Sequence, residues 1–169
     1  MKISTLLLIG ALSTSMAAFG ADKISAKEFV KKAGEAGVAE VEMGKLGAQK
    51  ATDADVKAYA QQMVTDHTKA NKELMAAAKA KGLEVPTEPG LMHKGVMEKY
   101  KHESADSDFN RDYMQRMVKD HEQVVQLFQT AANDTTLDPE LRAFAKKTLP
   151  TLQEHLAEAQ KLDSKLAKM

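Results

Sequence analysis

Apolar residues recur at every third or fourth position along four long stretches of the chain, which predicts four amphipathic α-helices. The four stretches span residues 25–51, 53–82, 107–131 and 138–162. The first opens with a capping box, Ser25-Ala26-Lys27-Glu28, and the last opens with proline at its first helical position. No stretch keeps an alternation of period two, so we expect no β-sheet.

The segment between the second and third helices loses this periodicity and contains Pro86 and Pro89, with a short helix expected over 91–101. About 25 residues can run the whole ~40 Å length of a helix and reset the direction of the chain. Residues 53–60 and 138–145 also share a charge and apolar pattern, as two copies of one helical hairpin would. The sequence therefore predicts an all-α, ferritin-like four-helix bundle with one long crossover, occupying residues 21–169.

Two kinds of residue should modify these helices. Glycines weaken helices, so their recurrence in the first helix indicates close packing against a neighbour. These glycines are Gly34, Gly37, Gly44 and Gly47. Pro150 lies inside the last helix and should kink it.

The N-terminus has the pattern of a secretory signal peptide over residues 1–20. A basic start is followed by an apolar run over 3–16 and by small residues over 17–21. The alternative, a membrane anchor, is disfavoured because the run is shorter than the ~20 residues that span a bilayer. We expect a periplasmic protein with no membrane span in its mature chain.

Composition excludes several classes of protein. The 169 residues include 24 Lys and Arg, 24 Asp and Glu, and no Cys. Without cysteine there is no disulfide, thiolate zinc site or thiol nucleophile, and balanced charge disfavours a nucleic-acid partner. Hydrolases fit poorly, because no catalytic triad, carboxylate pair or phosphate-binding loop stands out, and we assign no catalytic residue.

Each long helix carries one metal-ligating residue type on its apolar face: Glu40, His67, His121 and His155. The first two lie 13 and 14 residues from the turn at position 53, and the last two each lie 17 residues from position 138. At about 1.5 Å per residue, each count gives the distance of a side chain from its own turn along the helix. The two turns are expected at opposite ends of the bundle, and the distances from the two turns add up to about one helix length. The four side chains should therefore form one layer.

Imidazole and carboxylate ligands suit Fe, Mn, Cu or Zn. Di-iron bundles place a glutamate three residues before the histidine, whereas this chain has Val64, Val118 and Leu152 there. A single transition-metal ion is the better hypothesis. The alternative is that each histidine is a core residue bonded to a neighbouring carbonyl or carboxylate.

Residues next to these histidines suggest supporting roles. Asp66 and Asp120 each precede a histidine and could accept a hydrogen bond from a neighbouring imidazole, or could be exposed acids. Met63 and Met117 each lie four residues before a histidine, one turn away. Thioethers suit Cu(I), so a periplasmic copper-binding protein is one alternative, and a metal-free module that binds an envelope partner is another.

Four segments carry a resemblance to a known family: Glu-Val-Glu-Met-Gly-Lys-Leu at 40–46, Met-Val-Thr-Asp-His at 63–67, Asp-Tyr-Met-Gln-Arg-Met-Val-Lys-Asp-His at 112–121, and Thr-Leu-Pro-Thr-Leu-Gln-Glu-His-Leu at 148–156. Together they resemble the bacterial secreted family called domain of unknown function forty-one forty-two, whose members are often labelled outer membrane proteins. The resemblance implies a ferritin-like bundle in the cell envelope and no established activity. We therefore expect a periplasmic bundle that binds a transition metal, for metal handling or protection against oxidative stress.

Overall fold

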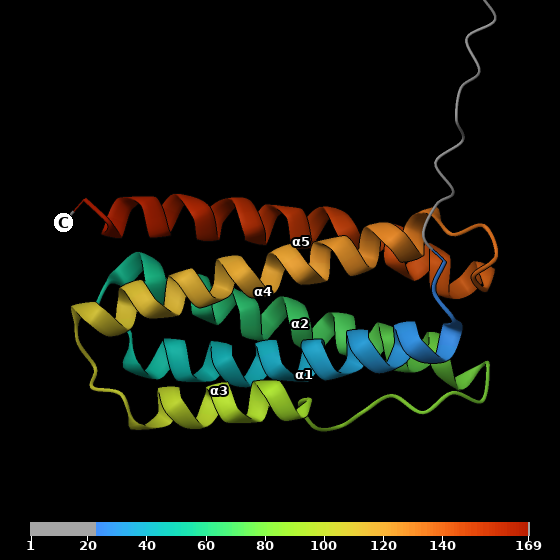
Figure 1. Cartoon of the computed structure of the whole chain (residues 1–169), viewed down its shortest axis with the longest axis horizontal. Helices are drawn as coiled ribbons and strands as arrows, with labels where there is room; N and C mark the ends of the chain where they lie inside the picture. The colour runs from blue at the N-terminus through green and yellow to red at the C-terminus, as the bar shows by residue number, and fades with distance from the viewer. Residues whose placement is uncertain (1–22, 169) are drawn as a thin grey trace, which may run out of the picture.

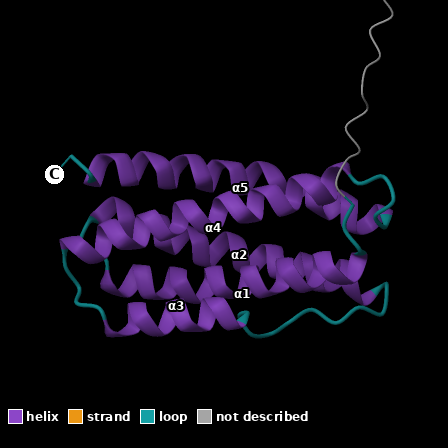
Figure 2. Ribbon diagram, in the orientation of Figure 1, coloured by secondary structure: helices purple, strands orange, loops and turns teal. Residues whose placement is uncertain are grey.

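Five α-helices make up the part of the chain that the structure describes, residues 23–168 of a computed structural model (Figures 1 and 2). They are α1 (Ala26–Lys50), α2 (Ala54–Lys79), α3 (Leu91–His102), α4 (Ser107–Asn133) and α5 (Pro139–Leu166). The predicted all-α class is confirmed, and α3 is the short helix expected in the long connection. The signal peptide expected over residues 1–20 lies outside the described residues.

Local signals in the sequence account for the ends of the long helices. Ser25 Oγ accepts a hydrogen bond from the backbone N–H of Glu28 at 3.2 Å. The side chains of Asp53 and Asp138 each accept two backbone N–H groups at the starts of α2 and α5. After α2, Gly82 adopts a positive φ of 65°, the left-handed conformation in which glycine commonly ends a helix.

The four long helices form two hairpins. Helix α1 packs most extensively against α2, and α4 against α5, while α2 also contacts α5 and α1 contacts α4. The two hairpin turns lie at opposite ends, and the segment after α2 returns along the whole bundle, so α2 and α4 run in the same direction (Figure 1). Helix α3 lies in this return and packs against α1. Helix α5 continues through Pro150.

Close approach between α1 and α2 requires glycine on α1. A Cβ atom on Gly37 would lie 2.0 Å from Oδ1 of Asn71. A Cβ atom on Gly44 would lie 2.9 Å from the carbonyl oxygen of Ala60, which is backbone and cannot turn aside. The two helices therefore pack at a distance that no larger residue at these positions would allow without a shift.

The buried core divides into two apolar clusters along the bundle. One cluster is rich in Phe and Leu, and includes Phe29, Leu74, Phe128, Leu141 and Phe144. The other is rich in Met and Tyr, and includes Met43, Met63, Tyr113, Met114 and Met117. On each long helix, buried polar residues separate the buried residues of one cluster from those of the other: Glu40 on α1, His67 on α2, Asp120 and His121 on α4, and His155 on α5.

No helix within residues 23–168 is both long and apolar enough to cross a membrane.

Candidate metal centre

Three histidines from three helices meet in the layer between the two apolar clusters. His67 comes from α2, His121 from α4 and His155 from α5, and their exposed fractions are 4%, 0% and 2%. Their ring centroids lie 5.4 to 5.6 Å apart, close to an equilateral triangle. One ligand atom from each ring lies within 4.8 Å of the other two, a spacing at which one ion could contact all three.

In two of the three histidines, a hydrogen bond fixes which ring nitrogen can bind an ion. Nδ1–H of His121 donates to the carbonyl oxygen of Met117 at 2.9 Å, since a carbonyl can only accept. Nε2–H of His155 donates to Oδ2 of Asp66 at 3.0 Å. These bonds leave a lone pair on the opposite nitrogen of each ring, as in histidines that bind metals. Asp66 thus lies where an acceptor that orients His155 is needed.

Each of the three rings also has one nitrogen that is buried without a protein partner. Among the described residues, Nε2 of His67, Nε2 of His121 and Nδ1 of His155 form no hydrogen bond. A buried polar atom of this kind usually has a partner, and an exception calls for an explanation such as a bound ion or water.

Burial also keeps these imidazoles neutral, which is the form that binds metal. Desolvation is the largest cause that lowers the pKa of each histidine, and neighbouring imidazoles add to the effect at His67 and His121. At His121 the pKa falls from 6.5 to about 4. No proton therefore competes for these nitrogens at neutral pH.

Glu40 lies beside the three histidines and is not one of the converging group. Its exposed fraction is 3%, and its Oε1 is 4.0 Å from Nδ1 of His121. Its Oε2 is buried without a hydrogen-bond partner in the described structure. Burial, followed by the negative charge of Asp120, raises the pKa of Glu40 from 4.5 to about 8. The carboxyl group is therefore largely protonated at pH 7 unless a cation binds next to it.

Asp120 points away from the histidines. One of its oxygens forms an ion pair with Nε of Arg116 at 2.6 Å, and the other, Oδ1, has no partner within residues 23–168. Burial raises the pKa of Asp120, while Arg116 and His93 oppose that shift. Because adjacent helical residues point about 100° apart, Asp120 cannot share the inward direction of His121.

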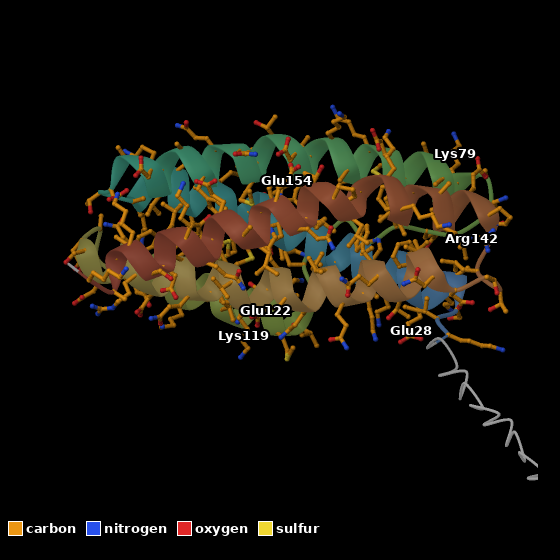
Figure 3. The ribbon with its side chains drawn as sticks, turned by 90° about the horizontal axis from the view of Figure 1, so that it is seen from above. Glu28, Lys79, Lys119, Glu122, Arg142 and Glu154 are labelled. Atoms are coloured by element: carbon orange, nitrogen blue, oxygen red, sulfur yellow. The ribbon has the colours of Figure 1, made fainter. Side chains whose placement is uncertain are left out.

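Neighbouring residues also divide into some that point outward and some that are buried. Lys119 and Glu122, which flank Asp120 and His121 in the sequence, extend outward from α4 (Figure 3). Met63 and Met117 are fully buried, one turn from His67 and His121, in the Met-rich cluster.

Two partners at the site were not expected from the sequence: Arg116 for Asp120, and the Met117 carbonyl for His121. The four-residue spacing between each pair could have indicated both.

A small cavity adjoins the site. It has a volume of about 20 Å³ and is lined by His67, Glu40, Asn71 and Thr148, among others. That volume can hold about one water molecule, provided the walls supply polar partners. A ligand the size of water could therefore sit next to His67.

A comparison with protein families assigns the chain to one family. The model of the family described as Domain of unknown function (DUF4142) matches residues 11–162. The chain belongs to this family. The match to DUF4142 confirms the predicted family and covers all four polar residues of the layer, but its description names no activity. No curated protein and no solved structure matches the chain.

Proposed function

We propose that this DUF4142 protein is an exported, ferritin-like bundle that binds one transition-metal ion through His67, His121 and His155, with Glu40 beside the ion. Its role would be metal handling or protection against oxidative stress in the periplasm. Two observations carry this proposal: one ring nitrogen from each buried histidine lies within 4.8 Å of the other two, and each ring has one buried nitrogen without a hydrogen-bond partner among the described residues.

The energetic cost of an empty site supports binding. Each buried polar atom without a partner destabilises a fold by about 1–3 kcal/mol. Three such nitrogens in one layer would be unfavourable in a metal-free core, where leucine would pack without this cost. An ion bound by all three would satisfy every one of them.

The fourth position decides what such an ion could do. Three imidazoles leave one coordination position open on a tetrahedral ion. If a change of rotamer brings the Glu40 carboxyl group from the Nδ1 side of His121 into this position, the site is closed and suits storage or structure. If water fills it from the adjoining cavity, a small molecule such as peroxide could exchange with that water.

Copper is the second candidate, and the Met-rich cluster favours it. Met43, Met63, Met114 and Met117 are all buried in the cluster that begins one turn from the histidines. Thioether sulfur and imidazole nitrogen together select Cu(I) over harder ions. Methionine also fills core gaps in many proteins that bind no metal, so the histidine geometry takes precedence.

Titration of the chelator-treated protein tests the proposal. Co(II) should bind with one ion per chain and produce a visible absorption band, and Zn(II) should displace it. The band should be lost in His67→Ala and retained in His102→Ala, since the His102 side chain is 78% exposed. Parallel titrations with Fe(II) and Cu(I) rank the metals.

Absence of binding by any of these ions would support the metal-free alternative, a module that binds an envelope partner. That alternative predicts that replacement of His67 and His121 by leucine leaves stability equal or greater.

A further inference from the structure

A groove lies on the outside of the bundle next to the histidine layer. It has a volume of about 470 Å³ and is bordered by α1, α4 and the first turn of α3. Its lining includes Glu40 of α1, Asp120 of α4, and Met92 and His93 of α3.

Two nearly inaccessible carboxylates line this groove. The side chains of Glu40 and Asp120 are each 4% exposed. Each has one oxygen, Oε2 of Glu40 and Oδ1 of Asp120, that forms no hydrogen bond within the described part of the chain. Arg116 occupies only the other oxygen of Asp120. Both carboxyl groups thus border the groove, and within residues 23–168 each has one buried oxygen that no donor or cation satisfies.

Glu40 connects the groove to the histidines. It lines the groove, and it also lines the small cavity next to His67. Its Oε1 lies 4.0 Å from Nδ1 of His121. The same carboxyl group thus borders the groove on one side and the three-histidine layer on the other, where a change of rotamer could carry a bound ion inward.

We propose that Glu40, Asp120 and His93 form an entry site for divalent transition-metal ions, from which an ion passes to the three core histidines. This inference rests on the proposed function. Carboxylate oxygens and one imidazole bind Fe(II), Mn(II), Co(II) or Zn(II), and the three nitrogens of the core then retain the ion. The Arg116 guanidinium limits how strongly the entry site can hold a cation, so the ion is not trapped there.

Stopped-flow measurement of Co(II) loading tests this entry site, with the absorption band of the core site as the signal. His93→Ala removes a ligand of the entry site and should slow loading; Asp120→Asn removes a negative charge and should slow it by about tenfold, the lower end of the acceleration that a focused field produces. Release to excess chelator should slow by the same factor, because an entry site changes both rates and leaves the equilibrium affinity unchanged. The parallel change in both rates should hold for His93→Ala and for Asp120→Asn.

Two exposed residues give matched controls, His102→Ala and Asp108→Asn, whose native side chains are 78% and 76% exposed. Both should load at the wild-type rate. If His93→Ala and Asp120→Asn also load at the wild-type rate, the entry site is refuted while the core site stands. If the wild-type protein shows no Co(II) band, the proposed function fails and the entry site fails with it.

Discussion

Replacement of Glu40 by glutamine should remove a pH-dependent part of the stability of the metal-free protein. The pKa of Glu40 is about 8 in the folded chain, against 4.5 for an unperturbed glutamic acid. Between these values the folded state keeps a proton that the unfolded state releases, so this group lowers stability as pH rises. At ~1.4 kcal/mol per pH unit, the raised pKa of Glu40 should lower the free energy of unfolding of the wild-type protein by about 2–3 kcal/mol between pH 5 and pH 7.

The comparison with Glu40→Gln isolates this effect. The three buried histidines have lowered pKa values and act in the opposite sense, because their contribution is lost as pH falls. They are present in both proteins and cancel in the difference. The free energy of unfolding of Glu40→Gln, minus that of wild type, should therefore increase by about 2–3 kcal/mol from pH 5 to pH 7.

Urea unfolding of chelator-treated protein at several pH values provides the measurement. Glu42→Gln is a suitable control on the same helix, since the Glu42 side chain is 41% exposed. If the difference between wild type and Glu40→Gln stays constant from pH 5 to pH 7, Glu40 ionises as an exposed carboxyl does and its pKa is not raised by burial. With a metal ion bound beside Glu40, the pH dependence of the difference should disappear, since the cation favours the ionised carboxylate.

Three further changes test other contacts of the structure. Asp66→Asn weakens the acceptor that orients His155, and metal affinity measured by competition with a chelator should fall about 10–100-fold; an unchanged affinity would exclude that role. Gly37→Ala places a Cβ atom 2.0 Å from Oδ1 of Asn71, so thermal unfolding should occur at a lower temperature, and Asn71→Ala in the same chain should restore much of the loss. Lys50→Met removes an ammonium group that donates to three carbonyl oxygens at the end of α3, so amide hydrogens of α3 should exchange faster with no comparable change in α5.

The sequence predicted the helices well because their signals are local. The caps at Ser25, Asp53 and Asp138 and the positive φ of Gly82 each depend on a few neighbouring residues. The long connection between α2 and α4 followed from its length and prolines. Helices α1, α2, α4 and α5 accordingly begin and end within four residues of the predicted positions.

The site was harder to predict, because residue counting gives the level of a side chain along the bundle and not its rotation about the helix axis. Glu40 lies at the expected level, but on the Nδ1 side of His121 and outside the group formed by the three histidines. Asp120 is one residue from His121 and faces Arg116 instead of an imidazole. The rotation of each helix depends on packing between helices that are distant in sequence, which no local pattern records.

The metal content of the protein shows whether the three buried histidines bind an ion in the cell. The measurement is elemental analysis of untagged protein purified from the periplasm, beside a His67→Ala/His121→Ala double variant and the exposed control His102→Ala. We predict close to one Fe, Mn, Cu or Zn ion per chain in the wild type and in the control, and none in the double variant. If wild-type protein contains no metal and takes up none after reconstitution with Fe(II), Cu(I) and Zn(II), the three histidines are core residues and not a metal site.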